Sequence, residues 1–192
     1  ILTTGGVRCW GDNAYGQLGL GNALPVGDDE MPTVDVPLGG ATATAVTAGL
    51  FHTCALLSTG AVRCWGDNFY GQLGDGTTTN RFVPTQIGTD TNWKAVDAGG
   101  SHTVAIRKDG TLWAWGGNLA GQVGDGTTAD RWVPTQIGSS TDWKAVSAGS
   151  HTVAIRTDGT LWTWGQRLEC LVASVDGCTT DPYHLVPTQI GA

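Results

Sequence analysis

The stretch Ala98-Gly-Gly-Ser-His-Thr-Val-Ala-Ile, continued by Gly110-Thr-Leu-Trp-Ala-Trp-Gly-Gly-Asn, decides the fold because it recurs along the chain. Related stretches begin at Ala48 and Ala148. The spacings between the matching tryptophans are 55, 50 and 49 residues. These tryptophans are Trp10, Trp65, Trp115 and Trp164. A period near 50 residues is typical of one four-stranded blade of a β-propeller.

The pattern within one unit predicts the strands of such a blade. Residues 102–107 alternate between apolar and polar types and predict a strand, and residues 111–115 predict the return strand. Between them, Gly110 can take the positive φ that a type I turn with a bulge requires. Residues 133–137 form a further short strand whose proline favours a sheet edge, and residues 94–96 complete the blade.

The repeated pattern Ala-Gly-x-x-His-Thr-x-Ala-x-x-x-x-Gly-x-x-x-x-Trp-Gly-x-Asn-x-x-Gly-Gln-x-Gly resembles the regulator-of-chromosome-condensation repeat. The resemblance covers nearly the whole chain, and we expect it to be closest to secreted bacterial members. It implies an all-β protein with a β-propeller, usually of seven blades. It implies no single function, because relatives include a nucleotide-exchange factor, a plant UV-B receptor and bacterial inhibitors of β-lactamase.

We therefore expect residues 1–192 to form a single all-β array, a β-propeller-type array of about four four-stranded blades. The predicted units are a partial first unit (1–46), two full units (47–96 and 97–146) and an atypical last unit (147–192).

The sequence predicts that the two ends of the chain form complementary halves of one blade. Three arrangements remain open: part of a larger propeller, a self-closed ring of four blades, or completion by a neighbouring subunit. Head-to-tail contacts that do not close give open filaments. We expect a larger array or a filament rather than a self-closed ring, because the ring would still lack a connecting strand and a partner for Cys9.

Two loops depart from the repeat. The first unit has a longer acidic loop over residues 21–40, and the last unit replaces the Gly-Gln-Leu-Gly-Asp-Gly-Thr segment after Gln166. We expect the specificity of the protein in these two loops or in the short loops. The interaction residues predicted in the two long loops are Asp28, Asp29, Glu30, Leu171 and Val172.

Cysteine positions predict a cross-strand disulfide in the second unit. The hairpin register places Cys54 opposite Cys64, where opposed Cβ atoms lie about 4.5–5.5 Å apart. The following unit has Val104 and Ala114 at these positions. The alternative is a pair of free buried thiols.

The remaining cysteines are Cys9, Cys170 and Cys178. Cys170 and Cys178 lie in the atypical loop, where we expect a second bridge rather than a metal site, because no paired Cys or His spacing for zinc is present. Cys9 has no partner in the repeat, and we expect it to be unpaired or intermolecular. Paired, non-catalytic cysteines indicate an oxidising compartment, so we expect an extracellular or cell-surface protein.

Repeated side chains are expected to be structural rather than catalytic. His52, His102 and His151 occupy one repeat position, and we expect each to hydrogen-bond a backbone carbonyl at the Ala-Gly turn. Asp75 and Asp125 begin Asp-Gly-Thr segments that favour a turn over a calcium loop.

The tryptophans are also expected to be structural. Trp65, Trp115 and Trp164 should fill the core between blades. Trp113 should share the strand face of Trp115. Since these residues lie on predicted strands rather than in the turn before His-Thr, we do not expect photoreception.

Charge and composition narrow the choice of partners. The chain has a net charge of −7 with only ten Lys and Arg residues, which disfavours nucleic-acid binding because that binding depends on cations that neutralise phosphates. No apolar stretch approaches the roughly 18 residues needed to span a bilayer, so we expect no membrane insertion. No catalytic residues, metal or cofactor are predicted, and we do not expect an enzyme.

Two functional interpretations remain. The first is a secreted or cell-surface structural or interaction module that self-assembles into a filament or appendage, with other copies of itself as partners. The second is a recognition propeller that binds a protein or glycan through its loops, as an inhibitor or adhesin would. Nucleotide exchange on a small GTPase is a distant third.

Overall fold

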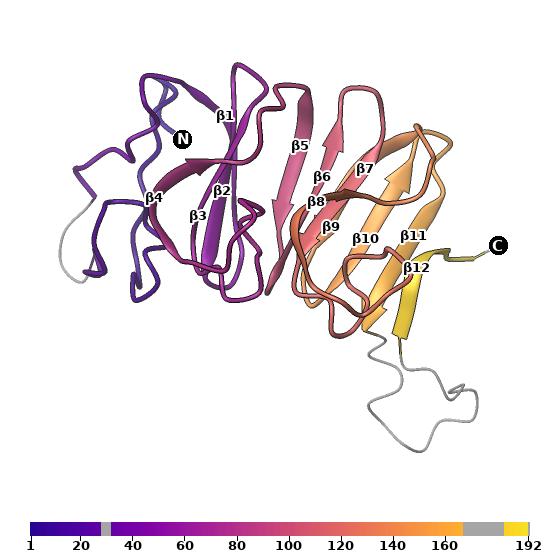
Figure 1. Ribbon diagram of the computed structural model, residues 1–192. Coiled ribbons are helices and arrows are strands. Elements are labelled where there is room, and N and C mark those ends of the chain that lie inside the picture. The colour runs from indigo at the N-terminus through magenta and orange to yellow at the C-terminus, as the bar shows by residue number, and fades with distance from the viewer. Residues whose placement is uncertain (28–31, 167–182, 192) are drawn as a thin grey trace.

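The computed structural model describes residues 1–27, 32–166 and 183–191, and it confirms the expected all-β propeller fold (Figure 1). Its strands lie in three four-stranded antiparallel sheets, each built from consecutive strands. The first sheet contains β1 (Ala43–Ala48), β2 (His52–Leu57), β3 (Val62–Gly66) and β4 (Arg81–Gln86). The second contains β5 (Trp93–Ala98), β6 (His102–Arg107), β7 (Leu112–Gly116) and β8 (Arg131–Gln136). The third contains β9 (Trp143–Ala148), β10 (His151–Arg156), β11 (Leu161–Gln166) and β12 (Tyr183–Gln189).

Residues before β1 supply part of a fourth blade. Gly11 pairs with Val26, and the Val36 amide donates to the Val7 carbonyl at 2.8 Å. The Ile87 amide donates to Val62 in the same way in the next unit, at 2.9 Å. The first unit thus carries counterparts of the last two strands of a blade.

The described ends of the chain, residues 1–11 and 183–191, do not pair with each other. Figure 1 shows the N-terminal residues beside the first sheet and the C-terminal end beyond the third. Within the described residues, no backbone hydrogen bond joins residues 1–11 to 183–191. The self-closed ring is therefore not formed in this structure.

Tryptophans fill the space between neighbouring blades, as predicted. Trp65, Trp115 and Trp164 are 0%, 0% and 1% exposed. Trp115 packs against residues of the preceding sheet such as Leu56. Trp113 and Trp115 both contact the ring of Trp93, which confirms that they share a strand face.

The recurring Gly-Gln-x-Gly segment reaches across to the next blade. The Gln72 carbonyl accepts hydrogen bonds from Trp115 Nε1 at 3.0 Å and from Thr103 Oγ1 at 2.7 Å. Gly74 has a φ of +78°, and a Cβ atom there would lie 2.6 Å from Trp115 Nε1. This contact explains why glycine recurs two residues after the glutamine.

The structure contains the disulfide that the hairpin register predicts. Cys54 and Cys64 are paired residues of β2 and β3, with Cα atoms 4.1 Å apart and sulfur atoms bonded. Cys9 is a free thiol. The predicted Cys170–Cys178 bridge lies outside the described residues. No helix capable of crossing a bilayer occurs in the part of the chain that the structure describes.

Candidate functional site

Exposed apolar side chains gather on the loops at one end of the blades. Leu50 and Phe51 form the β1–β2 turn and are 67% and 36% exposed. Phe69 and Tyr70 follow β3 and are 70% and 44% exposed. Leu119 follows β7 and is 81% exposed. We call this surface the loop face; it is defined by Tyr15, Leu50, Phe51, Phe69, Tyr70 and Leu119.

Aromatic contacts extend the loop face over the first unit. The rings of Tyr15 and Phe51 have centroids 5.0 Å apart, and those of Phe69 and Tyr70 lie 4.9 Å apart, edge to face. Large exposed apolar patches are uncommon on monomers and mark interaction sites. Aromatic side chains are also enriched in protein interfaces.

The loop face is hollowed between the blades. A hollow of about 490 Å³ is lined by Leu50, Tyr70 and Leu119 together with small turn residues. The β1–β2 turn carries Leu50 and Phe51, whereas the β5–β6 turn carries Gly100 and Ser101 at the same positions. The β9–β10 turn is one residue shorter and places Ser150 before its histidine. Bulky side chains in one turn and small ones in the next two thus shape the hollow.

Backbone hydrogen bonds hold the turns under the loop face together. The Leu50 amide donates to the Gly99 carbonyl at 3.2 Å, and the Gly100 amide donates to the Gly149 carbonyl at 2.9 Å. A Cβ atom on Gly49 would lie 2.3 Å from the Gly99 oxygen, so only glycine allows this approach. The turns are therefore fixed relative to one another before any partner binds, which lowers the entropy cost of binding.

Buried asparagines fix the loops that carry Phe69, Tyr70 and Leu119. Asn68 is 0% exposed; its Nδ2 donates to the carbonyls of Thr77 and Thr79, and its Oδ1 accepts from the Leu73 amide. Asn118 makes the corresponding bonds in the next unit. Because a buried amide that is fully hydrogen-bonded specifies one conformation, the exposed side chains start from a rigid base.

The repeated histidines connect neighbouring blades. His52 Nε2 lies 2.9 Å from Thr103 Oγ1, and His102 Nε2 lies 2.8 Å from Thr152 Oγ1. The expected partner, a backbone carbonyl at the Ala-Gly turn, was wrong for these two residues. His151 has no threonine partner within the described residues, and its buried Nδ1 has no hydrogen-bond partner among them.

Each threonine hydroxyl fixes the tautomer of its histidine. Thr103 donates its single hydroxyl proton to the Gln72 carbonyl, so it accepts from His52 Nε2–H. Burial lowers the pKa of His52 to about 3, assisted by the nearby His102. Burial likewise lowers the pKa of His102 to about 4, against the opposing effect of Asp97. Both rings are neutral and enclosed, which suits a structural role.

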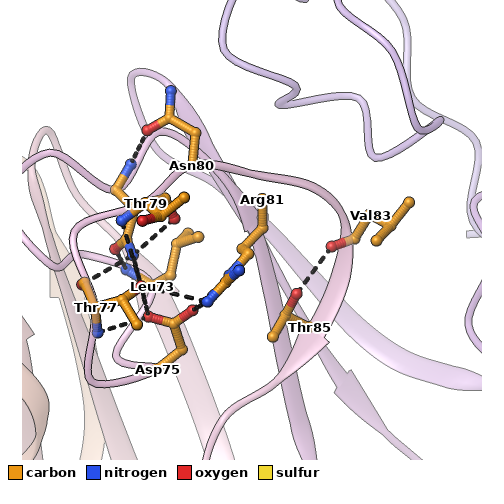
Figure 2. A network of polar contacts seen from close by, with 9 residues as sticks. Leu73, Asp75, Thr77, Thr79, Asn80, Arg81, Val83 and Thr85 are labelled. Atoms are coloured by element: carbon orange, nitrogen blue, oxygen red, sulfur yellow. Dashed lines mark hydrogen bonds and ion pairs between the residues drawn. The ribbon is translucent and has the colours of Figure 1, made fainter.

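The Asp75-Gly-Thr segment forms a turn closed by Arg81 (Figure 2), and Asp125 is paired with Arg131 in the next unit. Asp75 Oδ1 accepts from the Thr77 amide at 3.0 Å and its hydroxyl at 2.7 Å, and Oδ2 accepts from Arg81 Nε at 2.6 Å. Burial alone would raise the pKa of Asp75, but hydrogen bonds from Thr77 and Arg81 outweigh it and lower the pKa. Since the guanidinium already neutralises the carboxylate, this geometry supports the turn interpretation over calcium.

The interaction residues predicted from the two unusual long loops lie outside the described residues. They are Asp28, Asp29, Glu30, Leu171 and Val172. The prediction named the short loops only in general and missed the individual residues of the loop face. A comparison of the units with each other would have singled out Leu50, Phe51 and Tyr70, because the next unit has Gly100, Ser101 and Ala120 at these positions.

Comparison with known proteins identifies the repeat. The family model "Regulator of chromosome condensation (RCC1) repeat" matches residues 4–56, 59–106 and 109–155. A second model of the same repeat matches residues 43–72 and 93–122. These matches cover most of the chain.

Two curated relatives show the extent of similarity in sequence. The chain is 40% identical over 81 residues to the probable E3 ubiquitin-protein ligase HERC4 of Homo sapiens, covering 42% of this chain and 8% of that protein. It is 37% identical over 87 residues to the ultraviolet-B receptor UVR8 of Arabidopsis thaliana, covering 45% of this chain and 19% of that protein. The match thus spans less than a fifth of each relative. Both relatives are eukaryotic, so they do not support the expected closeness to secreted bacterial members.

Solved structures share the fold. Prp20p from Saccharomyces cerevisiae, whose structure was described with its binding properties to Gsp1p and histones, superposes with a TM-score of 0.76 at 22% identity. That match covers 95% of this chain and 45% of Prp20p. Human WBSCR16 superposes with a TM-score of 0.72 at 23% identity over 93% of this chain and 46% of that one. At these identities the likeness establishes the fold alone.

Proposed function

Since the chain belongs to the regulator of chromosome condensation (RCC1) repeat family, we propose that it is a protein-recognition module that binds its partner through the loop face. The single observation that carries this function is the hollowed apolar surface formed by Leu50, Tyr70 and Leu119 on a rigid set of turns. Prp20p was described with its binding to Gsp1p and histones, which supports protein binding as a function of this fold.

Recognition without catalysis fits the side chains available. His52 and His102 are each 1% exposed and hydrogen-bonded to threonines, which fits a structural role. Asp75 and Asp125 are each paired with an arginine. In contrast, the exposed residues of the loop face are mostly apolar or aromatic, and such residues anchor protein interfaces.

A matched pair of variants tests this function. The face variant Leu50→Asn/Leu119→Asn changes two highly exposed side chains, and the control Val83→Thr/Val133→Thr changes two exposed side chains on β4 and β8. Each protein is immobilised and exposed to an extract of the source organism, and bound proteins are quantified by mass spectrometry. We expect one or more proteins to bind the wild type and the control but not the face variant. Binding that is independent of the loop face would contradict the proposed function.

An oxidising location is part of the proposed function. Cys54 and Cys64 are both 0% exposed. The next unit has Val104 and Ala114 at the equivalent positions, so the disulfide replaces an ordinary pair of packed side chains. Because disulfides persist in oxidising compartments, we propose that the protein acts outside the cell or at its surface. Rapid alkylation of free cysteines in the protein in its native source, without reductant, tests this location. Full alkylation of Cys54 and Cys64 would contradict it.

Self-assembly is a second candidate, and the exposed Trp10 favours it. Trp10 is 64% exposed, whereas the three matching tryptophans are buried between blades. A buried site for Trp10 on another copy would give a head-to-tail contact and thus a filament or appendage. Electron microscopy of the purified protein distinguishes the two: regular fibres would support assembly, and discrete particles would support recognition of another protein.

A further inference from the structure

The hollow in the loop face is negatively charged. Its lining includes Asp67 and Asp130 and contains no lysine or arginine among the described residues. Three loops carry most of the loop face: residues 11–16 and 66–71 contain one aspartate each, residues 116–121 contain none, and none of the three contains a lysine or arginine. Apolar and acidic side chains are therefore combined on one surface.

These carboxylates are not neutralised within the described part of the chain. Asp67 accepts from Gln72 Nε2 at 2.6 Å, and Asp130 accepts from the Asn118 amide at 2.8 Å, so both partners are uncharged donors. The ion pairs of the described residues involve other aspartates: Asp35, Asp75, Asp90, Asp125 and Asp142. Negative charge in a partly enclosed site acts more strongly on a partner than the same charge in bulk water.

The walls of the hollow suit a large side chain beside a cation. Leu50, Tyr70 and Leu119 supply apolar surface, and the small residues Ser101 and Ser150 leave room between them. An arginine can stack on an aromatic face while its guanidinium pairs with a carboxylate. Aromatic and arginine residues are also the usual anchors of protein interfaces.

We propose that the partner of the loop face is a protein segment with an aromatic or aliphatic anchor flanked by arginine or lysine, a specificity that rests on the proposed function. The anchor occupies the hollow between Leu50 and Leu119, and the flanking cations face Asp67 and Asp130. Charge complementarity of this kind determines the choice of partner and the association rate.

Three short peptides test the charge preference directly. They are acetyl-Gly-Arg-Trp-Arg-Gly-amide, its glutamine version with Gln-Trp-Gln, and its glutamate version with Glu-Trp-Glu. Each is titrated into the ¹⁵N-labelled chain and followed by amide chemical shifts. We expect the arginine peptide to shift amides around Leu50, Tyr70 and Leu119 and to bind about tenfold more tightly than the glutamate peptide. This preference should shrink with added salt, which screens charges.

Charge-removing variants complete the test. The repeat already carries asparagine at the position of Asp130, because Asn80 accepts from the Asn68 amide as Asp130 does from the Asn118 amide. Gly117 occupies the position of Asp67, so the fold does not require a carboxylate there. Asp67→Asn/Asp130→Asn should weaken binding of the arginine peptide and leave that of the glutamine peptide unchanged.

Three results would overturn the charge preference: equal binding of the arginine and glutamate peptides, shifts outside the loop face, or no binding of the arginine peptide. None of them bears on whether the face variant loses a natural partner. The capture experiment therefore decides the proposed function separately.

Discussion

His52 Nε2 lies 2.9 Å from Thr103 Oγ1, a hydroxyl group on the following blade. The same bond joins His102 to Thr152, so a buried hydrogen bond links each sheet to the next. Each threonine in turn donates to the carbonyl of a glutamine in the preceding loop. His52 and His102 are therefore part of the connection between blades.

Acid should weaken this connection. The pKa values of His52 and His102 are lowered from an ordinary 6.5 to about 3 and about 4 in the folded protein. Between these values and pH 6.5, the two side chains therefore stay unprotonated in the folded protein but bind protons in the unfolded chain. The free energy of unfolding is thus unaffected above pH 6.5 and decreases as the pH falls toward 4. The limiting slope is about 1.4 kcal/mol per pH unit for each histidine. Urea denaturation across this range measures it.

His52→Gln and His102→Gln are the matched controls. A glutamine amide can donate to the threonine hydroxyl but does not titrate, so each variant should have a smaller slope between pH 6.5 and 4. Asp75 and Asp125 have lowered pKa values, so their contribution is lost only below the ordinary value of 3.8. An unchanged slope in both variants would show that these histidines do not determine the acid response.

Removal of the disulfide should destabilise the first sheet. The variant Cys54→Val/Cys64→Ala copies the Val104 and Ala114 pair of the next blade, so it removes the covalent link while keeping a packing pair that this fold accepts. For a loop this short, loss of the link should cost about 2–3 kcal/mol in the free energy of unfolding. Cys54→Ala/Cys64→Ala should cost more, because a cavity adds to the loss.

Urea denaturation of the three proteins without reductant measures both effects. Reductant should lower the stability of the wild type by more than that of the two variants, which keep only the predicted Cys170–Cys178 bridge. Equal stability of the wild type and the Val/Ala variant would mean that the disulfide contributes nothing.

The Ala-Gly turn offers a matched pair of glycines. A Cβ atom on Gly49 would lie 2.3 Å from the Gly99 carbonyl oxygen, whereas a Cβ atom on Gly149 would meet its nearest atom at 3.9 Å. Gly49→Ala should therefore destabilise the protein by about 1–3 kcal/mol. Gly149→Ala should be neutral or slightly stabilising. Thermal denaturation of both variants tests this, and equal melting temperatures would argue against the close approach of the turns.

The blade could be predicted from the sequence because its signals are local and repeated. Alternation, turn glycines and the register of Cys54 with Cys64 depend on neighbouring residues within one hairpin. The partner of His52 could not be predicted, because Thr103 lies 51 residues away and its position depends on how two blades pack. The loop face is similar: Leu50 and Leu119 line one hollow, and Tyr15 contacts Phe51, although these residues come from loops of separate units.

Matching tryptophans should differ in their contribution to stability because their surroundings differ. Trp115 is 0% exposed and packs against the preceding sheet, whereas Trp10 is 64% exposed at the same repeat position. Trp115→Ala should cost about 3–5 kcal/mol through lost apolar burial and a cavity. Trp10→Ala should change the free energy of unfolding by less than about 0.5 kcal/mol, as is usual for surface substitutions. Denaturation at low protein concentration measures both. A large loss for Trp10→Ala that grows with protein concentration would show that Trp10 is buried against another copy of the chain.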